Sequence, residues 1–184
     1  MRLKILAFAA IPLLLIGIAC SSNQRATNAD NVKSANNASY KDNVKKALEQ
    51  ADLKDVTVEE DRDKNTITLG GTVHSEKAKQ QAAEVAKASA GNRVVANEIA
   101  VRPVGQESEA RTISSNLDSA IEKNYKAALV SKGLDKQHIR YDAKNGVLTL
   151  KGSVKTPDQR KQAQEVAASI PNVQQVLNEL EVRR

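Results

Sequence analysis

The chain has 184 residues, of which 28 are Lys or Arg and 22 are Asp or Glu, so its formal charge is +6. This length allows one ordinary domain or two small ones. A single Cys excludes an intramolecular disulfide and a cysteine-based zinc cluster, and two His leave little material for any other metal site. Three Tyr and no Trp are too few for base-stacking platforms, which argues against nucleic acid as a partner.

The N-terminus has the pattern of an export signal. A short basic start precedes an apolar stretch from Ile5 to Ala19, which is shorter than the roughly 20 residues needed to span a bilayer. The segment Ile16–Cys20 resembles the lipobox of bacterial lipoproteins, although Gly17 stands where Leu is usual. This resemblance implies that residues 1–19 are removed and that Cys20 carries a lipid anchor.

An ordinary secretory signal that happens to end near a cysteine is the alternative interpretation. If Cys20 is lipidated, the absence of Asp after it resembles sorting to the outer membrane of a Gram-negative cell. The stretch 20–39 is rich in Ser, Asn and Ala and has almost no large apolar residue. It cannot bury a core, so we expect a flexible tether between the anchor and the fold.

The rest of the chain contains two copies of one sequence repeat. When the sequence is shifted by 81 residues, 44–101 aligns with 125–182 without a gap and the segment TITLGGTV falls on VLTLKGSV. Such self-similarity predicts two copies of one structural unit. We place the first domain at 40–102, a linker at 103–114 and the second domain at 115–184.

Each copy begins with apolar residues at helical spacing, such as Val44 and Leu48, and continues with two short alternating runs separated by a turn. Asn145-Gly146 between such runs is a strong hairpin signal. A second helix follows, over 76–90 and 157–170, with Ser75 or Thr156 as its N-cap, and a last strand completes the copy. The prediction is an α+β fold of two α-β-β-α-β domains, each with two helices on one face of a three-stranded mixed sheet.

The order of strand, Gly-x-Val, helix and Asn-Glu-x-x-Val resembles the BON domain, a module of bacterial envelope proteins that include osmotically inducible ones. The residues that carry the motif in the two copies are Gly71, Asn97 and Glu98, and Gly152, Asn178 and Glu179. Gly71 and Gly152 lie inside strands, where glycine suggests a bulge or a close backbone approach. A lipobox followed by two such domains also resembles the dual-BON outer-membrane lipoproteins.

No catalytic constellation is present in the sequence, and we expect neither an enzyme, a metal site nor a cofactor. His74 and His138 have no nucleophile or carboxylate in a matching pattern, so both are interpreted as surface residues. The segment 61–65 superficially resembles the start of an EF-hand loop. It lacks the required Gly and the final Glu, so it is interpreted as a solvated turn.

Charge distinguishes the two copies. Residues 40–102 hold 11 basic and 11 acidic side chains, whereas 115–184 hold 12 and 8, a net charge of +4. The candidates for contact with anionic phospholipid are Lys123, Lys126, Lys132, Lys136 and Arg140. The opposing interpretation is that these side chains only keep a small domain soluble.

The BON resemblance implies phospholipid or envelope association. It therefore favours a non-enzymatic, membrane-anchored protein on the periplasmic side of the bacterial envelope that supports envelope integrity or stress tolerance. The alternative is a periplasmic chaperone or adaptor that binds other envelope proteins.

Overall fold

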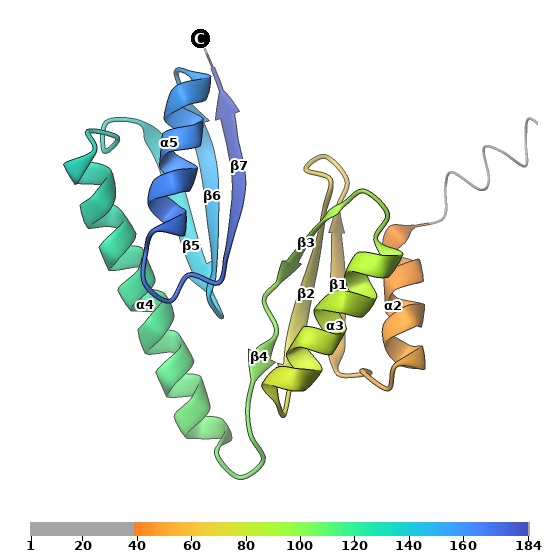
Figure 1. The fold of residues 1–184 in the computed structure, drawn as a ribbon. Helices are drawn as coiled ribbons and strands as arrows, with labels where there is room; N and C mark the ends of the chain where they lie inside the picture. Colours follow the sequence, from red (N-terminus) through yellow and green to blue (C-terminus); the bar gives the residue numbers. More distant parts are fainter. Residues whose placement is uncertain (1–38, 184) are drawn as a thin grey trace, which may run out of the picture. The chain divides into compact units, whose positions relative to one another are not determined.

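The computed structural model describes residues 39–183. The predicted signal peptide, Cys20 and all of the predicted tether except Ser39 lie outside the described residues. The described residues belong to one compact unit, and within it the chain forms two repeats of the order α-β-β-α-β (Figure 1). None of the described helices is both long and apolar enough to cross a membrane.

The first repeat forms a mixed sheet covered on one side by two helices. Its elements are α2 (Tyr40–Gln50), β1 (Val56–Asp61), β2 (Thr66–Val73), α3 (Glu76–Ser89), β3 (Val94–Asn97) and β4 (Ala100–Val101). Strand β1 is antiparallel to β2, and β3 and β4 are parallel to it. A helix that connects β2 to a parallel neighbour gives the crossover expected from the sequence.

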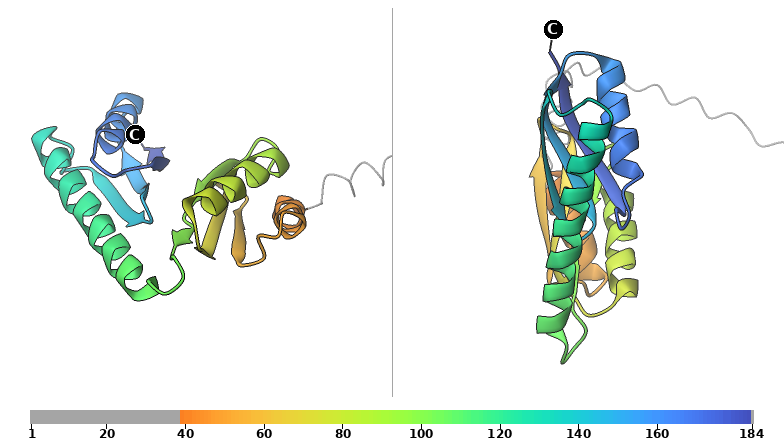
Figure 2. Two further views of the ribbon diagram at one scale, coloured as in Figure 1. Left: turned by 60° about the horizontal axis from the view of Figure 1, so that its bottom comes forward. Right: turned by 90° about the vertical axis from the view of Figure 1, so that its left-hand side faces the viewer.

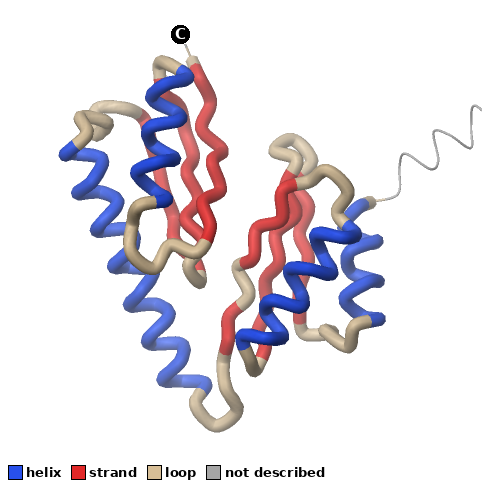
Figure 3. The backbone as a smooth tube through the Cα atoms, in the orientation of Figure 1, coloured by secondary structure: helices blue, strands red, loops and turns tan. Residues whose placement is uncertain are grey.

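The second repeat has the same arrangement. Its elements are α4 (Glu107–Ser131), β5 (His138–Lys144), β6 (Val147–Val154), α5 (Pro157–Ala168) and β7 (Gln175–Val182). Strand β6 lies between antiparallel β5 and parallel β7. The predicted α+β class and the tandem domains are confirmed, and in each repeat the two helices lie on the same side of the sheet (Figures 2 and 3).

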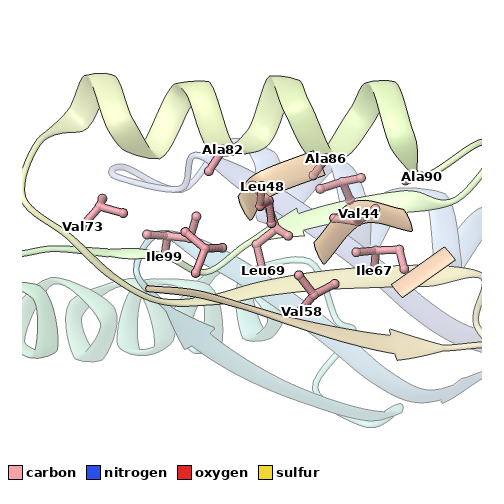
Figure 4. Close-up of a cluster of buried hydrophobic side chains, with 12 residues drawn as sticks. Val44, Leu48, Val58, Ile67, Leu69, Val73, Ala82, Ala86, Ala90 and Ile99 are labelled. Atoms are coloured by element: carbon pink, nitrogen blue, oxygen red, sulfur yellow. The ribbon is translucent and has the colours of Figure 1, made fainter. Parts of the chain in front are cut away.

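The core of each repeat is built where helix stripes meet the inward face of the central strand. In the first repeat Val44 and Leu48 of α2 meet Ile67 and Leu69 of β2 beneath the small side chains of α3 (Figure 4). The alanines of α3 let that helix approach the sheet closely. In the second repeat the fully buried Tyr125 of α4 occupies the position of Val44, so an aromatic ring fills the equivalent space.

The predicted helix starts are confirmed. The Ser75 hydroxyl accepts the backbone N–H of Ala78, and that of Thr156 accepts the backbone N–H of Gln159 at 3.2 Å. The Gln159 side chain returns to the backbone of Thr156 and completes a capping box. These bonds satisfy N–H groups that have no partner inside their helix.

The two motif glycines lie where backbone approaches backbone. Gly71 has φ of +92° and Gly152 has φ of +108°, a region that side chains rarely adopt. A Cβ on Gly71 would lie 2.2 Å from the carbonyl oxygen of Asp55, and one on Gly152 would lie 2.0 Å from that of His138. Only glycine therefore fits at either position.

In the first strand of each repeat, the structural correspondence between the two copies differs by two residues from the ungapped sequence alignment. Val56 lies opposite Gly71, but Ile139 lies opposite Gly152, so β1 and β5 correspond at a shift of 83 rather than 81. The second copy has two more residues before its strand and a hairpin loop shorter by two. Compensating changes of this kind leave the total length unaltered, so the alignment does not reveal them.

Two further boundaries differ from the sequence prediction. The helix of the second repeat begins at Glu107, inside the predicted linker 103–114, because polar helix formers continue the helix although most of its first turns stay exposed. The last strand of the first repeat, predicted as one element, is divided into β3 and β4. The Asn97 side-chain oxygen accepts the N–H of Ile99 at 3.3 Å at the interruption.

Candidate functional site

The outward face of α4 carries two lysines and one exposed valine. Ile121, Tyr125 and Leu129 are the buried residues of this helix. Lys123, Lys126 and Val130 lie on the opposite side, because residues three, four and seven positions apart share one face of a helix. All three are exposed, and Val130 is 58% exposed. We call these three residues the α4 outer face.

The corresponding face of α2 has different chemistry on the same backbone. The helices correspond at a shift of 81, so the positions equivalent to the α4 outer face are Asp42, Lys45 and Glu49, which are also exposed. An acidic and basic mixture in the first repeat is therefore replaced by two cations and an apolar side chain in the second. The fold requires neither these residues of α2 nor the α4 outer face, since neither group of side chains faces a core.

The structure separates the other predicted lipid contacts from this face. Lys132 is the C-cap of α4, and Lys136 is exposed in the loop that follows. Arg140 lies on β5 between Ile139 and Tyr141, both of which pack against the core on the helix side. Arg140 therefore points to the helix-free face of the sheet and cannot contact the same flat surface as Lys123.

Val130 was absent from the sequence prediction, which considered only charged residues. Its position seven residues after Lys123, away from the buried stripe, is the signal that would have revealed it. An exposed apolar residue beside cations distinguishes a surface that can enter a lipid interface from one that is only solvated.

The motif asparagines attach the last strand of each repeat to the preceding helix. Asn97 donates from its side-chain amide to the carbonyl oxygen of Lys79 in α3 at 3.2 Å. Asn178 donates in the same way to that of Arg160 in α5 at 3.3 Å, and its side-chain oxygen accepts the N–H of Leu180. An amide has both donors and an acceptor, so it can bind two backbone groups at once.

The motif glutamates form ion pairs between the two repeats. Glu98 of the first repeat pairs with Lys144 at 2.8 Å, and Glu179 of the second pairs with Lys64. Each lysine belongs to the hairpin region of the other repeat. Hydrogen bonding to these carboxylates raises the pKa of Lys64 and of Lys144 above the ordinary value for lysine.

Amide groups add to this contact. The Gln175 side chain accepts the N–H of Asn97 at 3.2 Å and donates to the carbonyl oxygen of Val95 at 2.8 Å. The amine of Lys79, whose residue is 6% exposed, donates to the carbonyl oxygen of Asn145 at 3.3 Å and to Gln174 at 3.4 Å. Burial lowers the pKa of Lys79. The seam between the repeats is therefore polar and directional.

A group of polar contacts around the Glu60 carboxylate fixes the start of the described chain. Glu60 accepts the hydroxyl of Ser39 at 2.7 Å and lies 2.9 Å from the guanidinium of Arg93, which also stacks over the Tyr40 ring. The hydrogen bond from Ser39, opposed in part by burial and aided by the N–H of Lys41 and by Arg93, holds the pKa of Glu60 below its ordinary value. This cluster fixes the entry into α2.

The described residues offer no group of three His, Cys, Asp or Glu side chains that could hold a metal ion. His74 is exposed and contacts the carbonyl oxygen of Arg102 through Nδ1 at 2.9 Å, and His138 is exposed on β5. The segment 61–65 forms the β1–β2 turn, in which the Asp61 carboxylate accepts the N–H of Lys64.

The fold and these contacts define a tandem repeat of small α+β modules. In each module the glycine of a Gly-x-Val strand meets the neighbouring backbone, and the asparagine and glutamate of an Asn-Glu strand make the same hydrogen bonds and ion pairs. The family model of the BON domain matches residues 36–103 and 117–184, and the chain belongs to this family.

The chain is 28% identical over 142 residues to osmotically-inducible protein Y of Escherichia coli (strain K12), an alignment that covers 76% of this chain and 69% of that protein. Two solved structures of CdsD, a structural protein of the type III secretion system of Chlamydia trachomatis, are more distantly similar. One, of its C-terminal domain, has 13% identity and a TM-score of 0.33, covering 78% of this chain and 96% of that one. The other has 11% identity and a TM-score of 0.35, covering 77% and 91%.

Proposed function

We propose that this BON-family protein is a non-enzymatic component of the bacterial envelope that binds anionic phospholipid through the α4 outer face. The observation that carries the proposal is the exchange between repeats: Lys123, Lys126 and Val130 occupy positions that hold Asp42, Lys45 and Glu49 in the first repeat. Cations are attracted to an anionic membrane surface, and an exposed apolar side chain can enter the headgroup boundary.

The proposal places the protein on the periplasmic side of the envelope, fastened by a lipid at Cys20. The lipobox-like segment and the similarity to an osmotically inducible relative support this placement. Attachment at Cys20 would hold the α4 outer face close to a membrane, so that even weak contacts would be populated. The role that fits is support of envelope integrity under osmotic or related stress.

Vesicle sedimentation tests the lipid contact. Residues 20–184 with Cys20→Ser are mixed with phosphatidylglycerol vesicles or with neutral phosphatidylcholine vesicles. Each basic side chain near an anionic surface contributes about 1 kcal/mol. Lys123→Asp removes one such contact and adds a repulsion, so it weakens binding to the anionic vesicles about five- to thirtyfold.

Lys155→Asp is the matched control, because Lys155 is also exposed in the second repeat but precedes α5 rather than lying on α4. It makes the same charge change and leaves binding within about threefold. Val130→Glu, which copies the first repeat, weakens binding as well. Equal sedimentation with neutral vesicles, or equal losses in the Lys123 and Lys155 variants, would refute the proposed face.

The anchor is tested separately by metabolic labelling with a fatty acid in a bacterial host. The wild-type chain incorporates the label and Cys20→Ser does not. Label retained in the variant would contradict lipidation at this residue. The rival role, as a chaperone or adaptor, predicts suppressed aggregation of an unfolded client that is unaffected by vesicles and by Lys123→Asp.

A further inference from the structure

The helix-free face of the second sheet carries a groove that the proposed lipid contact does not use. Its volume is about 520 Å³. The residues that line it include Lys64, Arg140, Lys151, Ser153, Glu179 and Glu181. The groove therefore combines neighbouring parts of all three strands of the second sheet with one lysine of the first repeat.

Two cations lie directly opposite each other in this groove. Arg140 on β5 is paired in register with Lys151 on β6, and both side chains are exposed on the same face. Like charges directly across a strand pair destabilise a sheet. Over the described part of the chain, neither of them has a carboxylate within ion-pair distance. Asp142 lies on the same face of β5, and Glu179, the register partner of Lys151 on β7, is paired with Lys64.

The fold does not require this charge pair. The same register position in the first repeat is occupied by Thr57 opposite Gly70, which are uncharged. The two sheets have the same strand order and the same positive-φ glycine beside this position. The cations are therefore an addition to the common scaffold and point to a ligand rather than to folding.

The carboxylates of the groove are already engaged. Glu179 pairs with Lys64, and Glu181 pairs with the guanidinium of Arg183 at 2.6 Å. Two of the four Lys and Arg side chains are thus neutralised, and Arg140 and Lys151 leave a net charge of +2.

We propose that this groove binds the phosphate group of a phosphomonoester. Such a group carries a charge near −1.5 to −2 at pH 7, which matches the net charge of the groove. The planar guanidinium of Arg140 suits two phosphate oxygens at once, and Lys151 supplies a point charge on the other side. The volume leaves room for an organic group attached to the phosphate. The phosphomonoester is either a soluble molecule or the headgroup of a lipid, and the chemistry of recognition is the same for both.

The test is a titration of residues 20–184 carrying Cys20→Ser, followed by the backbone amide NMR signals. The probes are inorganic phosphate and glycerol 3-phosphate, with sodium chloride at equal ionic strength as the salt control. We expect saturable shifts centred on Arg140, Lys151 and Ser153 that chloride does not reproduce. The double variant Arg140→Gln/Lys151→Gln lowers the affinity at least tenfold and retains the dispersed amide spectrum of the folded chain.

The control is the double variant Lys132→Gln/Lys161→Gln, which makes the same charge change at two exposed lysines outside the groove and leaves phosphate affinity within twofold. Absence of saturable shifts, an equal response to chloride, or unchanged affinity in the groove variant would overturn the proposal. Vesicles containing phosphatidic acid distinguish the two sources when they are tested in the Lys123→Asp background, in which the α4 outer face binds weakly. Sedimentation that the groove substitutions reduce further assigns a lipid headgroup. Binding of glycerol 3-phosphate with sedimentation that the groove substitutions leave unchanged assigns a soluble ligand.

The groove and the α4 outer face lie on opposite sides of the second sheet. Failure of the lipid contact removes phosphatidylglycerol binding and its dependence on Lys123, but leaves the amide shifts at Arg140 and Lys151. Failure of the phosphate site removes those shifts and leaves the vesicle result, so the two outcomes are separable.

Discussion

Replacing Gly152 by alanine is expected to destabilise the second repeat more than any other single methyl addition at a positive-φ glycine of that repeat. At φ of +108° an alanine is strained by about 1–2 kcal/mol. Its Cβ would also lie 2.0 Å from the carbonyl oxygen of His138, whereas real Cβ contacts essentially never fall below 3.0 Å. The β5 backbone must therefore move by roughly 1 Å away from β6.

Such a movement disturbs the pairing of Ile139 with Gly152 and of His138 with Ser153. Loss of one or two ladder hydrogen bonds costs about 1 kcal/mol each, so the total is about 2–4 kcal/mol. Gly133→Ala is the matched control, because Gly133 has φ of +67° but nothing within 4 Å of the added Cβ. It is expected to cost about 1 kcal/mol, from the backbone conformation alone.

Urea unfolding followed by circular dichroism measures both variants, with the free energy of unfolding extrapolated to water. The difference between them isolates the contact with the His138 carbonyl. Gly71→Ala in the first repeat, 2.2 Å from the carbonyl oxygen of Asp55, is expected to behave like Gly152→Ala. If Gly152→Ala is no more destabilising than Gly133→Ala, the close approach does not constrain the strand pair and the reasoning is wrong.

Three further outcomes are expected. The pKa of Glu60 is lower in the folded chain than its unfolded value near 4.5, so the ionised carboxylate stabilises the fold at pH values above 4.5 and this contribution is lost as the pH falls through the folded pKa. Glu60→Gln should therefore reduce the pH dependence of urea unfolding in acid. An unchanged dependence would argue against this contribution. Tyr125→Phe removes the 3.2 Å hydrogen bond to the carbonyl oxygen of Ala163 and should lower the free energy of unfolding in urea by about 1 kcal/mol. The Tyr141 hydroxyl makes no hydrogen bond within the described residues, so Tyr141→Phe should cost less. Gln175→Ala removes two hydrogen bonds to the β3 region and should lower the denaturant midpoint by the equivalent of about 1–2 kcal/mol, with the exposed Gln162→Ala as control. Equal midpoints would show that these two hydrogen bonds contribute nothing to stability.

Much of the fold follows from local rules that act within a few residues. The internal repeat, the helix stripe of Val44 and Leu48, and the caps at Ser75 and Thr156 all depend on near neighbours in the chain, and the structure has each of them. The Asn145-Gly146 turn is equally local: φ is +49° and +83° at the two residues, as a tight hairpin requires. Patterns of this kind are legible in a single sequence because the same residues that form the pattern make the contact.

Where the candidate lipid contacts lie on the fold could not be predicted from the sequence, for a different physical reason. A count of positive charges cannot tell which face of an element each side chain occupies. Lys123 and Arg140 belong to one basic domain, but they lie on opposite sides of its sheet because Ile139 and Tyr141 turn inward. The exposed Val130 was overlooked because its proposed contact depends on its neighbours in space rather than on its own charge.

The sequence alone was therefore sufficient for the two BON repeats, their order of elements and the location of the excess charge in the second repeat. The two-residue slip between β1 and β5, the opposition of Arg140 to Lys151, and the reciprocal ion pairs of Glu98 and Glu179 appeared only in three dimensions. All three depend on strand register or on contacts between residues far apart in the chain. These are fixed by the packing of the whole unit, and no local pattern records them.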